Sequence, residues 1–229
     1  MGFYDEWIEC IENNKDDIFY VKSFLYCSVS SIESIENGSE KCLMRIVDFL
    51  TGYDKNRIIN IIDDNFIKII TSVDVIQFSN FKIGTEELTH LLSYEKKGLT
   101  FNELGYLLID ASSDGAAEKY GENHAKVAKE LNLVSFSKEK PYIVHNTRLG
   151  DLFPYLNDDK QNKLISILSL RDPLIMTIIA KAKHGKVEYC NEVECLADST
   201  KLRRKSNVKY LIDLALTGID DDFVGNINF

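Results

Sequence analysis

Apolar residues recur at spacings of three and four along most of the chain, which is the period of amphipathic helices. The alternation typical of strands covers only two short runs, residues 133–137 and 142–146, on either side of a charged turn. The pattern therefore predicts a mainly α-helical fold with small β-hairpins. Three consecutive parts are expected, over residues 1–84, 85–155 and 156–229.

Residues 1–84 predict helices with weak boundaries. Apolar stripes are formed by Tyr4, Trp7, Ile8 and Ile11, by Ile18, Val21, Phe24 and Leu25, and by Leu43, Ile46, Val47 and Leu50. The last of these helices is expected to begin at Ser39, after the turn signal Asn37-Gly38. The isoleucine-rich stretch 57–70 could be helix or strand, and its period is closer to helical. We expect a helical N-terminal module, either a degenerate winged helix or an interaction surface.

Residues 85–155 have the order helix, helix, helix, hairpin. Thr85 is expected to cap the first helix, and the string from Thr100 to Glu103 is a T-x-x-E capping box that opens the second. The third helix is expected over residues 116–131. This order is typical of a winged helix-turn-helix, in which the third helix enters a major groove and the hairpin flanks it.

Residues 156–229 repeat this order in part. The expected elements are a helix over 159–170, a helix opened by Pro173, a short strand at Lys186 and Val187, a short helix over 188–196 and a long helix over 199–216. We expect a second helix-turn-helix or winged-helix-like unit.

The long helix over 199–216 has the clearest candidate chemistry. Ser199 or Thr200 can cap it, and its apolar side is expected to begin at Leu202. No acid lies between Asp198 and Asp213. A helix that begins with hydroxyls and concentrates cations in its first half suits a nucleic-acid groove. A solvated basic face, or a helix that docks on a protein partner, is the alternative.

The DNA-binding hypothesis assigns contacts to both third helices and to the hairpin turn. In the C-terminal unit, the cations are Lys201, Arg203, Arg204, Lys205 and Lys209, and the hydroxyls that position the helix are Ser199, Thr200 and Ser206. In the middle unit, the candidates are Lys119, Asn123 and Lys126 on the helix and Lys138 and Lys140 at the turn. Because glutamates are interleaved at 118, 122 and 130, an exposed polar face remains the alternative for the middle helix.

The charge of the chain restricts where a polyanion could bind. The formal net charge is −9, and residues 1–80 hold 14 acidic and 7 basic side chains, against 22 and 20 in the rest. An acidic body opposes non-specific phosphate binding and leaves docking to a local basic patch. The acidic N-terminal third equally suits a basic protein partner. No apolar run is long enough to span a membrane, and the N-terminus lacks a secretory pattern, so a cytoplasmic protein is expected.

Several catalytic and metal-binding classes lack support. The five cysteines, at 10, 27, 42, 190 and 195, have no paired framework, which favours free thiols in a reducing compartment. The spacing of His184, Cys190 and Cys195 fits no zinc pattern. The chain has no P-loop, G-x-G-x-x-G or H-E-x-x-H motif, and no nucleophile motif accompanies His145 and Arg148. We expect no metal, no cofactor and no enzymatic activity.

Four strings carry a resemblance: Leu104-Gly105, residues 119–126, residues 142–150 and residues 198–206. They resemble the tandem winged-helix repeats that form the DNA-recognition parts of restriction endonucleases and other bacterial defence proteins. The resemblance implies a protein that reads duplex DNA, as a transcriptional regulator or as the recognition component of a restriction or defence system. No acid followed by an acid-x-Lys string lies on convincing strands, so recognition is expected without cleavage. The alternative is a protein-binding module or homodimer that uses the acidic N-terminal third.

Overall fold

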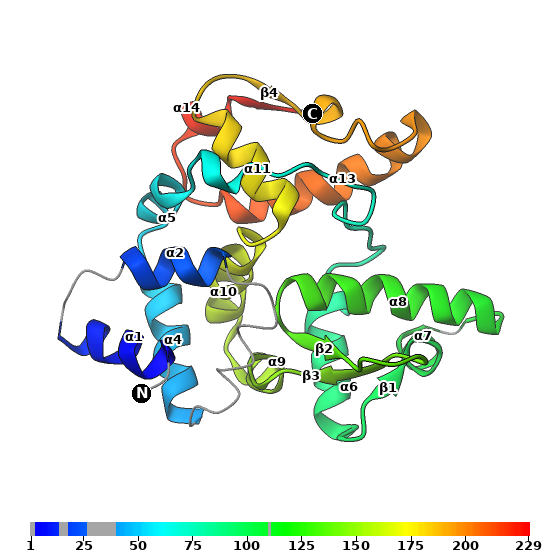
Figure 1. Ribbon diagram of the computed structural model, residues 1–229. Coiled ribbons are helices and arrows are strands. Elements are labelled where there is room, and N and C mark those ends of the chain that lie inside the picture. Colours follow the sequence, from blue (N-terminus) through cyan, green and yellow to red (C-terminus); the bar gives the residue numbers. More distant parts are fainter. Residues whose placement is uncertain (1–2, 14–17, 27–39, 110) are drawn as a thin grey trace. The chain divides into compact units, whose positions relative to one another are not determined.

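A computed structural model describes residues 3–13, 18–26, 40–109 and 111–229 (Figure 1). The chain is mainly helical, with 63% helix and 6% strand, and its sheets are small. It forms two compact units, one made of Met1–Val75 with Asn162–Phe229 and the other of Ile76–Gln161. In place of three consecutive parts, the chain thus has a first unit built from both ends of the sequence and a second unit inserted between them.

The N-terminal part of the first unit consists of short helices around buried apolar side chains. The helices are α1 (Phe3–Glu12), α2 (Ile18–Tyr26), α4 (Glu40–Gly52) and α5 (Lys55–Ile61), followed by the 3₁₀ turn η2 (Asp64–Phe66). Trp7 is fully buried, with its ring 5.7 Å from those of both Phe24 and Phe49. The apolar stripes are confirmed where side chains are described, except at Ile18, which is 40% exposed. The side chains of Tyr4 and Ile11, the turn at Asn37-Gly38 and the cap at Ser39 lie outside the described residues.

The isoleucine-rich stretch is not one helix, and that prediction is wrong beyond Ile61. Asp63 begins a new turn, because its carboxylate accepts a hydrogen bond from the backbone amide of Asn65 at 3.0 Å. A side chain that bonds to the nearby backbone competes with the continuing helix. Ile69, expected on the buried stripe, is instead 93% exposed.

The C-terminal part of the first unit completes it with helices and one two-stranded sheet. Its elements are α10 (Asp158–Ser169), α11 (Pro173–Ala182), β4 (Val187–Glu188), α12 (Tyr189–Glu192), α13 (Asp198–Ala215), α14 (Asp221–Val224) and β5 (Ile227–Asn228). Pro173 opens α11 as expected, and Asp172 caps it. β5 pairs with β4 in parallel, so the tail does not form a hairpin wing.

The two sequence segments of the first unit are joined by polar contacts as well as by the core. Lys183 Nζ donates to the carbonyls of Asn60, at 3.1 Å, and of Ile62. Lys55 Nζ donates to the carbonyl of Thr217 at 2.8 Å, and burial lowers the pKa of Lys55 to about 8. Each contact satisfies carbonyl groups that a helix end leaves without an intrahelical partner.

The second unit places helices against a three-stranded antiparallel sheet. Its elements are the π-helical turn η3 (Ile83–Glu87), α6 (Leu88–Tyr94), β1 (Leu99–Thr100), α7 (Phe101–Leu108), α8 (Asp114–Glu130), β2 (Val134–Phe136), β3 (Ile143–Asn146), α9 (Arg148–Leu152) and η4 (Phe153–Tyr155). The strand order is β1-β3-β2, so the predicted hairpin is confirmed as β2 and β3. Leu99 pairs with Val144 in this sheet.

Local signals fixed most helix starts in the second unit. The capping box is confirmed, because the Thr100 amide donates to Glu103 at 2.8 Å and the Glu103 amide donates to the Thr100 hydroxyl at 3.2 Å. The Thr100 amide and the Thr100 hydroxyl both donate to the Glu103 carboxylate, each at 2.8 Å, and they lower the pKa of Glu103. The predicted cap at Thr85 is wrong: Thr85 lies inside η3, and its hydroxyl donates to the carbonyl of Phe81 at 3.0 Å.

Helices α7 and α8 cross in close backbone contact (Figure 1). A Cβ atom at Gly105 would lie 1.9 Å from the Ala117 carbonyl oxygen, and one at Gly121 would lie 2.0 Å from that of Phe101. Glycine at mid-helix normally costs about 1 kcal/mol relative to alanine. Here the missing side chain lets the two helices cross at short distance, which explains why a glycine occupies position 121. His124, on the same helix, is also buried.

Candidate nucleic-acid interface

Helix α13 has a buried half and an exposed half. Val208, Leu211, Ile212 and Ala215 are buried in the first unit. Leu202, predicted to begin the apolar side, is 75% exposed, so that prediction is wrong. The packed apolar stripe begins only at Val208, and the first half of the helix contacts the first unit through polar groups, such as the Lys201 carbonyl that accepts from the buried Tyr189 hydroxyl at 3.2 Å.

The start of α13 also differs from the prediction. The helix begins at Asp198, with Ala197 at the N-cap and no side-chain capping bond. Ser199 and Thr200 therefore lie within the first turn, and the expected cap at either of them is wrong. Asp198 places a carboxylate in the first turn, where the helix dipole favours negative charge.

Three of the five α13 cations are engaged within the first unit. Arg204 donates to the carbonyls of Ser72, at 2.9 Å, and of Val75, and burial lowers its pKa. Lys209 pairs with Asp213 at 2.7 Å, and Lys201 lies 3.5 Å from Asp198. The assignment of Arg204 to DNA is therefore corrected: its guanidinium secures residues 72–75 to the helix.

The remaining cations define an outward surface. Arg203 is exposed and Lys205 is half-buried, and neither makes an ion pair with any residue in the described part of the first unit. We call the set Ser199, Leu202, Arg203, Lys205 and Ser206 the outer face of α13. Residues 199, 202, 203 and 206 share one side of the helix because they recur at three- and four-residue spacing. This face carries two positive charges and two hydroxyls, and the exposed Asp198 lies one helical turn before Leu202 at its edge, 3.5 Å from Lys201.

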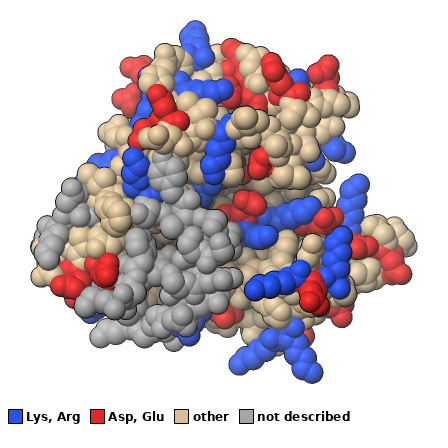
Figure 2. Space-filling view, viewed as in Figure 1, with Lys and Arg blue, Asp and Glu red and all other residues tan. Residues whose placement is uncertain are grey.

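Helix α8 concentrates no positive charge. Lys119 is exposed, but Glu118 precedes it, Lys126 pairs with Glu122 at 2.7 Å, and Asn123 is only half-exposed. Figure 2 shows Lys and Arg side chains interspersed with Asp and Glu over the visible face of the molecule. The alternative of an exposed polar face therefore describes α8 better than a basic recognition helix does.

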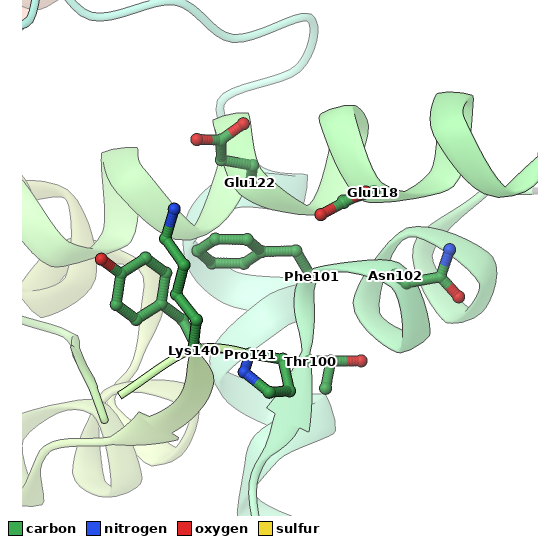
Figure 3. A pocket seen from close by; sticks show the side chains of 8 residues that line it. Thr100, Phe101, Asn102, Glu118, Glu122, Lys140 and Pro141 are labelled. Carbon is green, nitrogen blue, oxygen red and sulfur yellow. The ribbon is translucent and has the colours of Figure 1, made fainter. Parts of the chain in front are cut away.

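The hairpin turn places its two lysines differently from each other. Lys138 and Lys140 are both exposed, but Lys140 Nζ lies 5.7 Å from the centroid of the Tyr142 ring. Beside it is a pocket of about 650 Å³ between the turn, the start of α7 and the middle of α8 (Figure 3). The sequence reasoning missed this pocket, because its walls come from three separate segments.

No group of three or more His, Cys, Asp and Glu side chains in the described ranges is placed to hold a metal ion. His184 instead pairs with Asp64 at 2.7 Å, and Cys190 and Cys195 are exposed free thiols. No helix among the described residues combines the length and the apolar character that crossing a membrane requires.

The sequence matches no protein-family model, no curated protein and no solved structure. The resemblance to winged-helix recognition domains therefore stays a prediction, and any function must be argued from the geometry of the two units.

Proposed function

We propose that this protein binds duplex DNA through the outer face of α13. The observation that carries the proposal is the outward side of the first half of α13, on which Arg203 and Lys205 make no ion pair with acids in the described chain. Arginine and lysine on an outward helix contact phosphates and guanine edges, and hydroxyls such as those of Ser199 and Ser206 bind the sugar-phosphate backbone.

The proposed architecture is a pair of helix-turn-helix units. In the second unit, the order α6, β1, α7, α8, β2, β3 is that of a winged helix, with β2 and β3 as the wing. In the first unit, α12 and α13 follow one another as a helix-turn-helix would, with α13 as the recognition helix. Because α8 mixes charges, α13 supplies the principal contact, and Lys119 and Lys138 add weaker ones. The role proposed is a regulator or the recognition component of a restriction or defence system.

A titration with matched variants tests this proposal. Arg203→Gln with Lys205→Gln removes the two outward charges, and Lys96→Gln with Lys97→Gln removes two exposed charges from the second unit. We expect the first pair to weaken the binding of random duplexes strongly in an electrophoretic shift assay and the second pair to leave it nearly unchanged, with unaltered circular dichroism in both. Equal duplex binding by the Arg203/Lys205 variant would refute the assignment, and a parallel series with single strands and RNA tests the class of nucleic acid.

A protein-binding role is the second candidate function. The observation that favours it is the pocket of the second unit, whose walls carry aromatic rings and carboxylates. Salt separates the two functions by degree, because duplex affinity falls steeply as counterions are released from several phosphates, whereas a pocket that forms one ion pair gives only a shallow salt dependence.

A further inference from the structure

The pocket of the second unit has the dimensions of a ligand site. Its volume is about 650 Å³, within the range of roughly 300–1,000 Å³ usual for such sites. Three elements enclose it: the first turn of α7 with Phe101, the middle of α8 with Glu118 and Glu122, and the hairpin turn with Lys140 and Pro141 (Figure 3).

One wall of the pocket is aromatic. The ring of Phe101 lies 5.3 Å from that of Phe136 and 6.0 Å from that of Tyr142. Two ammonium groups already lie over this cluster, Lys129 Nζ at 4.7 Å from the Phe136 ring and Lys140 Nζ at 5.7 Å from the Tyr142 ring. Ring faces attract cations at such distances. The cluster is therefore a surface suited to positive charge.

The opposite wall is acidic. Glu118 and Glu122 lie one helical turn apart on α8, above the ring of Phe101 in Figure 3. Glu122 pairs with Lys126 at 2.7 Å. Glu118 is exposed and makes no ion pair or hydrogen bond with the described residues of its unit. A carboxylate at the mouth of the pocket is thus available to a cation that enters.

The walls are held in place before any ligand arrives. Gly121 lies between the two glutamates, and its backbone is so close to Phe101 that a Cβ atom would stand 2.0 Å from the Phe101 carbonyl oxygen. The capping box at Thr100 fixes the start of α7. A preformed site avoids the ordering cost that a flexible one adds to binding.

From this geometry we propose that the pocket binds an arginine side chain presented by a basic segment of a partner protein. A guanidinium is planar, so it stacks on an aromatic face while donating two parallel hydrogen bonds to one carboxylate. Phe101 and Tyr142 supply the faces, and Glu118 supplies the carboxylate. This site lies in the other unit from the outer face of α13, so the inference goes beyond DNA binding and does not depend on it.

Lys140 gives the proposal a distinctive consequence. In Figure 3 its side chain rises beside the Phe101 ring toward α8, where an entering guanidinium would lie. Lys140 therefore competes with a cationic ligand, and Lys140→Gln is expected to tighten arginine binding. If the hairpin turn instead contacted DNA, the same substitution would weaken DNA binding, because a phosphate contact would be lost.

The test is a ¹H–¹⁵N NMR titration of the full chain with the peptide acetyl-Gly-Gly-Arg-Gly-Gly-amide. The matched peptide with citrulline has the same shape but no charge. We expect the arginine peptide to shift amides of residues 100–102, 118–122 and 140–142, and the citrulline peptide to shift none of them. Glu118→Gln should weaken binding about fivefold, the scale of one partly exposed ion pair. Glu95→Gln, an equal charge change at an exposed site outside the pocket, should leave it unchanged.

Several outcomes would overturn the proposal. Shifts spread over acidic segments outside the pocket, or equal shifts with citrulline, would show that only general charge attracts the peptide. The same conclusion would follow if Glu118→Gln and Glu95→Gln behaved alike. Weaker binding of the arginine peptide by Lys140→Gln would contradict the competition between Lys140 and the ligand. Weaker duplex binding by Lys140→Gln, or pocket amides that a random duplex shifts and the arginine peptide does not, would assign this face to a polyanion. None of these outcomes bears on the outer face of α13, which the Arg203/Lys205 variant tests separately.

Discussion

The crossing of α7 and α8 allows a direct test of the packing that shapes the pocket. In Gly121→Ala, the new Cβ atom would lie 2.0 Å from the carbonyl oxygen of Phe101, 2.9 Å from its carbon and 3.0 Å from the amide nitrogen of Gly105. All three are backbone atoms, so no side-chain rotation relieves the overlap. One helix must move by about 1.4 Å to restore an ordinary contact of 3.4 Å.

The expected cost follows from two opposing effects. Overpacking a close-packed contact costs about 1–3 kcal/mol, and here the upper end applies because the atoms are backbone. Replacing a mid-helix glycine with alanine returns about 1 kcal/mol of helix propensity. The net loss in the free energy of unfolding of the second unit is therefore about 2 kcal/mol. Gly115→Ala, in the same helix with nothing within 4 Å of its Cβ position, should be neutral or slightly stabilising.

Hydrogen exchange over α7 and α8 in increasing urea measures this loss in the intact chain. Fluorescence of Trp7, buried in the first unit, provides the internal control and should be unchanged in both variants. If Gly121→Ala protects α7 and α8 as well as Gly115→Ala does, then the helices do not cross at the distance described, and the account of the pocket wall fails with it.

Three further predictions concern single side chains. Burial lowers the pKa of His124 from 6.5, so the folded second unit favours the neutral ring. The stability that this gives the unit is fully present above about pH 6.5 and should fall as the pH drops below that value. A urea midpoint that stays constant between pH 7.5 and 5.5 would contradict this. Arg204→Gln should destabilise the first unit by about 1–3 kcal/mol in unfolding followed by Trp7 fluorescence, because two carbonyls lose their donor, whereas Arg203→Gln should not. Equal unfolding midpoints for the two variants would show that Arg204 does not stabilise the unit. Glu103→Ala removes half of the capping box and should cost about 1 kcal/mol, seen as faster exchange in α7, and unchanged exchange would deny the cap a role.

Local signals predicted much of the second unit. The T-x-x-E string placed the start of α7 because both capping partners lie within four residues. The alternation on either side of the hairpin turn placed β2 and β3, since strand pairing across a short turn is also a local property. Pro173 marked the start of α11 for the same kind of reason.

Long-range packing explains what the sequence did not predict. Arg204 resembled its neighbour Arg203 in the sequence, but its carbonyl partners lie 129 and 132 residues away, so nothing nearby marked it as internal. Likewise, the apolar period through Ile69 suggested burial, and only the cap formed by Asp63 ends that helix early. The pocket could have been suspected from Glu118 and Glu122 at one-turn spacing, but Phe101 and Tyr142 come from other segments.

The salt dependence of duplex binding shows whether the outer face of α13 contacts phosphates. Each phosphate contact contributes about 0.9 to the slope of log affinity against log salt concentration. Fluorescence anisotropy of a labelled random duplex should give a steep slope for the natural chain, a slope smaller by about 2 for Arg203→Gln with Lys205→Gln, and an unchanged slope for Lys96→Gln with Lys97→Gln. Identical slopes for all three proteins, or no salt-dependent binding by the natural chain, would contradict the claim that the outer face of α13 contacts DNA.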